Sequence, residues 1–138
     1  MRHGLPYLVN CSILFTEVGR RVPAHCTGVG KALLSQLPDA EVLELVRRTG
    51  MPVRTPHTVA DPDALLAQLG DVRARGWAVD DEEQELGVRC VAAPLAGYPS
   101  GAAVSVSGPS GRLVTARIAE IGPVVKRAAA KIAAEMPA

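Results

Sequence analysis

The sequence of 138 residues has few aromatic side chains and no strong excess of either charge. Aromatic residues make up 3%, and 15 Lys and Arg against 14 Asp and Glu give a net charge of +1. A nucleic-acid surface needs a basic stripe, and single-strand binders add aromatic platforms, so both are disfavoured. No apolar run approaches the roughly 20 residues that span a membrane, and the first residues lack the pattern of a signal peptide. We therefore expect a cytoplasmic protein without a membrane partner.

Cysteine is also scarce. Cys11, Cys26 and Cys90 are widely spaced and odd in number. A disulfide framework needs pairs and a structural zinc site needs four patterned ligands, so neither is indicated. His25 lies beside Cys26, yet their spacing to Asp80 and Cys90 matches no local metal motif. We expect no metal and no other cofactor.

Length and periodicity predict one domain with its own core, and no repeat or linker indicates a second. A strand is expected over 7–15, and two or three strands over 77–109. The predicted helices are one capped near Thr27 and reaching about Gln36, one from Asp39 to Gly50, one from Asp61-Pro62 to Gly76, and one over 115–136. In the last helix, the predicted buried stripe is Ile118, Ile121, Val125, Ala129 and Ile132.

Small polar residues alternate along the predicted strands. Val88, Cys90 and Ala92 share one face, as do Ala103, Ser105 and Ser107 in the next strand. A hairpin through 98–101 would bring Cys90 near the two serines. A solvated face usually carries Lys, Glu, Arg or Thr, so this composition suits the floor of a pocket for a small polar molecule. A half-exposed face, or a covered one whose serines bond to backbone, fits equally well.

The segment Gly28-Val29-Gly30-Lys31 superficially resembles a phosphate-binding loop. A Walker loop needs Gly in place of His25 and Ser or Thr in place of Ala32, so that interpretation fails. Two glycines at a helix start leave N–H groups accessible to a small anion. They serve equally to let a helix pack closely on a sheet, and this segment alone favours close packing.

The acidic run Asp80-Asp81-Glu82-Glu83 reads mainly as a solvated turn. Asp80 shares a strand end with Val79, so it could turn inward and accept a hydrogen bond from a ligand hydroxyl. We expect the other three carboxylates to face solvent.

Three separated segments together resemble the effector-binding domain of IclR-type bacterial transcriptional regulators. They are RVPAHCTGVGKALL at 21–34, DDEE with GVRCVAAP at 80–94, and SVSGP at 105–109 with Arg112. Their order and spacing fit from about Gly19 to the C-terminus, and Trp77 stands where the family has an aromatic residue.

The resemblance implies a GAF-like α+β domain, in which helices pack on an antiparallel sheet around a pocket for a small metabolite, commonly a carboxylate or an aromatic acid. Some family members hold a metal in this pocket, which keeps His25 and Cys90 as candidate ligands. Family members bind their effector through positions that match Gly28, Val29, Asp80, the backbone at Val88, Cys90, Ser105 and Ser107.

Full-length family members carry an N-terminal winged helix-turn-helix that binds operator DNA, and they assemble as dimers or tetramers. By this resemblance, residues 1–138 are a single effector-binding domain that matches the family over about 19–138. We expect no DNA-binding domain in this chain, and opening strands that are truncated before Gly19.

The expected function is to sense a small organic acid and to control the DNA binding of an attached helix-turn-helix, as a homodimer or homotetramer. Two alternatives stay open: an enzyme that uses Cys90 as nucleophile or redox thiol, and a structural oligomerisation module. Because nothing in the sequence places a base near Cys90, we expect no enzymatic activity.

Overall fold

The computed structural model describes residues 19–97 and 101–136. Along the chain these form α2 (Gly28–Leu34), α3 (Asp39–Thr49), α4 (Pro62–Arg75), β1 (Ala78–Asp81), β2 (Val88–Pro94), β3 (Ala103–Pro109) and α5 (Thr115–Glu135). The predicted α+β fold class is confirmed. The strand expected over 7–15, the truncated opening and the tip of the predicted hairpin lie outside the described residues. None of the described helices combines the length and hydropathy needed to cross a membrane.

Local signals in the sequence set the ends of the helices. Asp61 caps α4 by accepting from the Ala64 N–H at 2.9 Å, and Pro62 occupies the first turn. Gly76 ends the same helix with φ of 96°, a left-handed conformation that favours glycine. Gly50 follows α3, as predicted.

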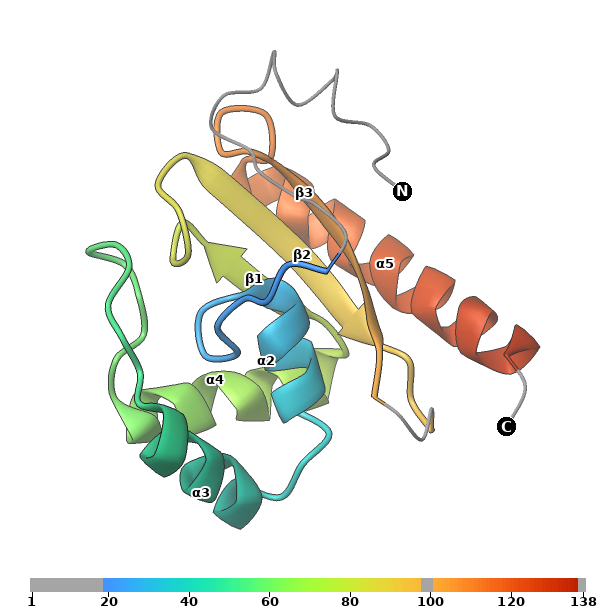
Figure 1. Cartoon of the computed structure of the whole chain (residues 1–138). Coiled ribbons are helices and arrows are strands. Elements are labelled where there is room, and N and C mark those ends of the chain that lie inside the picture. The colour runs from blue at the N-terminus through green and yellow to red at the C-terminus, as the bar shows by residue number, and fades with distance from the viewer. Residues whose placement is uncertain (1–18, 98–100, 137–138) are drawn as a thin grey trace.

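The sheet is antiparallel, with strand order β1-β2-β3 in the described part of the chain. Figure 1 shows the sheet between two layers, with α5 along one face and α2, followed by α3 and α4, on the other. The alternation predicted from the sequence holds. Val91 and Ala93 of β2 belong to the apolar cluster with α5, whereas Ala92 packs on the α2 side with Ala32.

Apolar side chains hold the helices on either side of the sheet. Val42, Leu65 and Leu69 are fully buried and join α3 and α4. On the opposite face, Ile118, Val125 and Ala129 are buried, Ile121 is half-buried, and Ile132 is 39% exposed. The prediction that Ile132 is buried is wrong.

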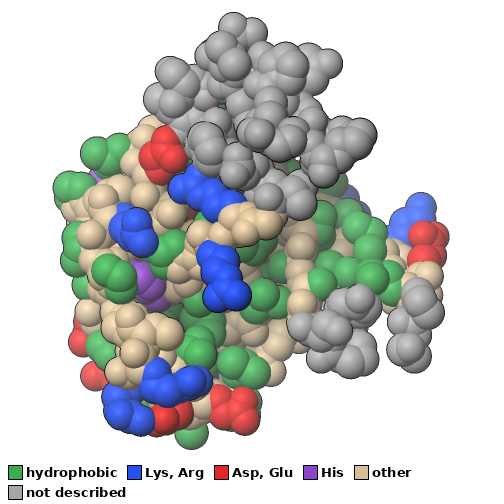
Figure 2. Space-filling model, viewed as in Figure 1, with side chains coloured by type: hydrophobic (Ala, Val, Ile, Leu, Met, Phe, Trp, Pro, Cys, Tyr) green, Lys and Arg blue, Asp and Glu red, His purple; other side chains and the backbone are tan. Residues whose placement is uncertain are grey.

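Charged side chains do not gather into a single basic surface on the visible face. Figure 2 shows Lys and Arg side chains interspersed with hydrophobic and uncharged ones, and lying beside acidic ones at the lower edge. Arg47 and Glu44 of α3 are exposed and form an ion pair at 2.7 Å. This distribution agrees with the near-neutral composition.

Candidate ligand-binding site

Side chains from three strands form a polar row on the face of the sheet that α2 covers. Asp80 is the Cα partner of Cys90, and Cys90 is the partner of Ser107. Directly opposed residues in antiparallel strands point to the same face, so a carboxylate, a thiol and a hydroxyl stand side by side. Ser105 lies opposite Ala92 on the same face. The placement of Cys90 beside the two serines is confirmed, whereas ligand binding by these residues stays a prediction.

The polar row, Asp80, Cys90 and Ser107 with neighbouring Ser105, runs from a buried end to an exposed end. Asp80 and Cys90 are 5% and 8% exposed, respectively. Both serines are exposed. The row is therefore covered over β1 and β2 and open over β3.

Gly28 begins α2 directly over Cys90. A Cβ at position 28 would lie 2.9 Å from the Cys90 Sγ and 3.3 Å from the Ala92 Cβ. Burial raises the pKa of the Cys90 thiol, and the nearby Gly28 backbone N–H opposes this shift. These contacts support the interpretation of the glycine segment as a device for close helix packing, and they place α2 immediately above the polar row.

Thr27 fixes the point at which α2 begins. Its hydroxyl oxygen accepts from the Gly30 N–H at 3.1 Å, and its hydroxyl donates to the Pro23 carbonyl at 2.6 Å. Gly30 lies so close to Ala24 that a Cβ would overlap the backbone there. The cap predicted at or beside Thr27 is confirmed at Thr27 itself, and the two glycines provide clearance on different sides of the helix.

The two cysteines in the described part, Cys26 and Cys90, are free thiols with raised pKa values. Burial raises the pKa of Cys26 to about 11, and the negative charge of Asp80 adds to the effect. Burial also raises the pKa of Cys90, although hydrogen bonds from Ser107 and Ser105 oppose the shift. Both thiols therefore stay protonated at neutral pH, a state that disfavours nucleophilic attack.

Asp80 turns inward near the end of β1, as predicted. Its Oδ1 accepts from the N–H groups of Glu83 at 2.8 Å and Gln84 at 3.4 Å. Burial raises the pKa of Asp80 to about 6, because the loss of solvent outweighs these two hydrogen bonds. The carboxyl group therefore titrates far closer to neutral pH than an exposed aspartate.

The prediction that Asp81, Glu82 and Glu83 face solvent is wrong for Glu83 and incomplete for the other two. Glu83 is buried, and its Oε2 lies 2.5 Å from the Lys31 Nζ. Asp81 is exposed but accepts from the Arg89 Nε at 2.7 Å, and Glu82 lies 3.6 Å from the same guanidinium. The acidic turn over 81–84 is thus held between the cations of Lys31 and Arg89. The pairing with Lys31 is needed because the buried carboxylate of Glu83 requires a partner.

Lys31 is a residue of this region that the sequence interpretation missed. Its side chain is 1% exposed and donates to Glu83, to the Gln68 Oε1 at 2.6 Å and to the Val79 carbonyl at 3.1 Å. These acceptors satisfy all three ammonium N–H groups. The signal was present in α2, GVGKALL, where a lone charge in an apolar helix requires a buried partner.

Val88 and His25 already have partners within the protein. The buried Val88 directs its N–H at the Glu85 carbonyl at 3.3 Å, so a ligand carboxylate would share that donor. The buried His25 has its Nε2 2.9 Å from the Pro52 carbonyl, which identifies Nε2 as the protonated nitrogen. Within residues 19–97 and 101–136, no group of three His, Cys, Asp or Glu residues could hold a metal ion.

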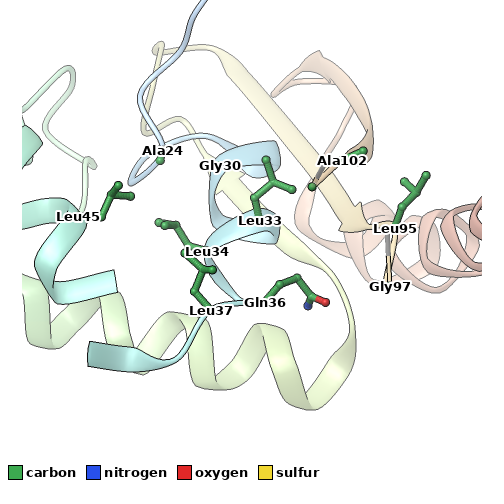
Figure 3. Close-up of a pocket in the computed structure, with 11 residues that line it drawn as sticks. Ala24, Gly30, Leu33, Leu34, Gln36, Leu37, Leu45, Leu95, Gly97 and Ala102 are labelled. Carbon is green, nitrogen blue, oxygen red and sulfur yellow. The ribbon is translucent and has the colours of Figure 1, made fainter. Parts of the chain in front are cut away.

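A pocket of about 620 Å³ lies beside the later part of α2, and none of the seven predicted ligand-binding residues lines it. Figure 3 shows Leu33 and Leu34 of α2 lying between Leu45 of α3 and the pair Leu95 and Ala102, which flank the β2–β3 connection. Its walls are mainly aliphatic. The concavity expected at the polar row is therefore not this pocket.

The fold and the polar row define a small α+β domain in which the start of a helix covers a sheet face of small polar residues. Residues 9–134 match the family described as "Bacterial transcriptional regulator IclR C-terminal". The chain belongs to the IclR family of bacterial transcriptional regulators and corresponds to its effector-binding domain. The resemblance found in the sequence motifs is thereby confirmed.

Individual relatives agree with this assignment. The acetate operon repressor of Salmonella typhimurium is 39% identical over 131 residues, which cover 90% of this chain and 47% of the repressor. The crystal structure of Thermotoga maritima IclR matches with a TM-score of 0.81 at 34% identity, covering 88% of this chain and 50% of that chain. The chain thus spans about half the length of these relatives.

A third relative contains a bound small molecule. It is the inducer-binding domain of the PobR transcription factor from Acinetobacter, a double mutant in complex with 3-hydroxybenzoic acid. The TM-score is 0.76 at 30% identity, and the match covers 83% of this chain and 67% of that chain.

Proposed function

We propose that this chain is the part of a transcriptional regulator that senses a small organic acid, and that the polar row holds the acid. The alignment of Asp80, Cys90 and Ser107 across three strands carries the proposal, with Asp80 and Cys90 covered and Ser107 exposed. Solvated sheet faces usually bear long charged side chains, and this one bears short groups that form hydrogen bonds. The complex of a related inducer-binding domain with 3-hydroxybenzoic acid supports the class of ligand.

The charges along the row orient the acid. An ionised Asp80 repels a second carboxylate, so the ligand carboxylate belongs at the opposite end, where the hydroxyls of Ser105 and Ser107 donate to it. A ligand hydroxyl then donates to Asp80, and the neutral thiol of Cys90 forms the floor between them. Backbone N–H groups are proposed to donate further hydrogen bonds to the acid. They belong to Gly28 and Val29 at the start of α2 and to Val88 at the start of β2.

Binding would act on DNA through a helix-turn-helix domain of the whole regulator, which would work in the bacterial cytoplasm. A ligand that favours one packing of this domain against its neighbours shifts the population toward that arrangement. In a homodimer or homotetramer, this shift would change the spacing between the helix-turn-helix domains. The acid site and the DNA-binding site would thereby be coupled.

The two rival functions lack comparable support. An enzyme with a Cys90 nucleophile needs a thiolate, whereas burial raises the pKa of this thiol. A purely structural module needs no row of polar groups at its sheet face, yet Asp80 is kept there at 5% exposure. We therefore propose a sensor without enzymatic activity.

Thermal unfolding with a panel of small organic acids tests the proposal. A ligand at a hundred times its Kd adds about 2.7 kcal/mol to the stability of the folded state, so a binding acid raises the Tm measurably. Hydroxy acids such as 3-hydroxybenzoate are expected to raise it more than the same acids without the hydroxyl. If no acid raises the Tm of the wild-type chain, the proposed ligand class is wrong.

Variants then locate the bound acid. Replacing both Ser105 and Ser107 with Ala removes the donors for the carboxylate, so the rise in Tm is expected to shrink or vanish. Ser110→Ala is the matched control, because Ser110 follows β3 outside the row. An equal response in the serine double variant and the control would place the ligand elsewhere.

A further inference from the structure

We propose that Lys31 is a positioning residue, which holds the acidic turn in the conformation that keeps the Asp80 carboxylate in the polar row. The inference rests on the proposed ligand site and specifies what fixes its buried end. The ammonium charge of Lys31 lies outside the polar row.

The ammonium group of Lys31 joins four separate parts of the fold. Lys31 belongs to α2, and its partners are Gln68 in α4, the carbonyl of Val79 in β1 and the carboxylate of Glu83 in the acidic turn. At 1% exposure, the cation has exchanged water for these acceptors. Displacement of the turn would therefore leave a buried charge without a partner.

Glu83 transmits this restraint to Asp80. Its side chain pairs with Lys31, and its backbone N–H donates to the Asp80 Oδ1 at 2.8 Å. The other carboxylate oxygen of Glu83 is 3.4 Å from the Val59 N–H. Because one residue contacts both the cation and the site carboxylate, a shift of the Glu83 side chain moves the donor that orients Asp80.

The backbone of the turn does not favour this conformation by itself. Glu82 has φ of 57°, a left-handed conformation that is uncommon for residues with a side chain. Contacts on both sides compensate, since the Glu82 Oε1 accepts from the Gly87 N–H at 2.8 Å and Arg89 pairs with Asp81. Lys31 supplies the restraint on the side that faces α2.

Amide hydrogen exchange in the ligand-free chain tests the role of Lys31. In Lys31→Met, the amides of Glu83 and Gln84, which donate to Asp80, are expected to exchange about tenfold faster or more. Amides in the middle of β2, such as that of Val91, provide the internal reference. Arg73→Met is the matched control, because Arg73 binds the carbonyls of Ser35 and Leu37 without contacting the turn.

A double variant separates positioning from stability. Lys31→Met leaves Glu83 buried and unpaired and could unfold the chain, whereas Lys31→Met with Glu83→Met removes both charges and is expected to recover stability. In this double variant, exchange at Gln84 stays fast and 3-hydroxybenzoate binds at least about tenfold more weakly than to wild type. Recovery of stability together with wild-type exchange at Gln84 would overturn the inference.

The two readouts keep the proposals distinct. If 3-hydroxybenzoate and the other acids fail to bind the wild-type chain, the proposed function fails, and exchange at Gln84 still decides the role of Lys31. If the acid binds wild type and the double variant equally, Lys31 is a stabilising residue only.

Discussion

Gly122 of α5 lies against the indole ring of Trp77, so closely that a Cβ at position 122 would overlap the ring. On the same ring, the guanidinium carbon of Arg75 is 5.7 Å from the centroid, and the Arg75 Nε donates to the Trp77 carbonyl at 2.8 Å. Trp77 thus sits between the end of α4 and the long helix. This contact helps to set how α5 lies across the sheet.

Substitution of Gly122 by Ala should destabilise the fold despite the higher helix propensity of Ala. The added methyl forces the ring or the helix to move, which costs about 1–3 kcal/mol. Urea unfolding measures the change. Gly70→Ala is the control, because Gly70 lies in α4 with no atom within 4 Å of a Cβ there, and about 0.5–1 kcal/mol of stabilisation is expected. A Gly122→Ala chain as stable as wild type would refute the close contact.

A methyl group at Gly28 should disturb the polar row directly. Its Cβ would press on the Cys90 Sγ at 2.9 Å, so Gly28→Ala is expected to lower both the Tm and the response to acids. Cys90→Ala removes the sulfur, so in the double variant the two effects should be less than additive for stability. The Tm values of wild type, the two single variants and the double variant complete this double-mutant cycle. Strictly additive effects would contradict the contact between position 28 and the Cys90 sulfur.

The raised pKa of Asp80 predicts how stability depends on pH. From its ordinary value of 3.8 up to about 6, the folded chain binds more protons at this group than the unfolded chain does. Stability therefore falls as the pH rises through this window. Asp80→Asn cannot titrate, so its stability relative to wild type should increase between about pH 4 and about pH 6 and level off above.

Urea unfolding of both chains at several pH values measures this difference. Because all other groups are shared, subtraction isolates Asp80 and its immediate partners. Asp63→Asn is a suitable control, since Asp63 is exposed in the first turn of α4. A pH-independent difference between Asp80→Asn and wild type would show that the folded-state pKa of Asp80 is not raised.

Alkylation should be slow at both described cysteines. A pKa of about 11 leaves Cys26 with about a hundredfold less thiolate at neutral pH than a thiol at 9, and burial limits access further. Iodoacetamide labelling at neutral pH, mapped by peptide mass, should give slow reaction at Cys26 and Cys90 and rapid reaction in urea. Fast labelling of folded Cys90 would instead favour the enzyme interpretation.

Much of the fold could be predicted because its signals are local. Thr27, Asp61 with Pro62, and Gly76 each act within one helical turn, so neighbouring residues suffice to place the helix ends. Alternation in β2 and β3 depends only on the pleat, so the faces of Cys90 and Ser107 follow from the sequence order.

The errors concern partners that are distant in the chain. Glu83 reads as a solvated carboxylate until the fold brings Lys31 beside it, and no local pattern links these two positions. Ile132 continues the apolar stripe of α5, but its burial depends on whether another element reaches that part of the helix. The alternation of side chains along the strands was enough to locate the polar row. That α2 covers the row could not be predicted, because this contact depends on tertiary packing.

The unequal exposure of the polar row has a consequence for selectivity. Asp80 and Cys90 are enclosed beneath α2, while Ser105 and Ser107 stand at the open margin. In the proposed site, the enclosed end would select the hydroxyl-bearing part of the ligand by size and hydrogen-bonding pattern, since a misfit there has no water to compensate it. The open margin places little steric limit on what extends beyond the serines. Acids that present the same hydroxyl to Asp80 and differ in the substituents near their carboxylate should therefore compete for the proposed site with similar affinity.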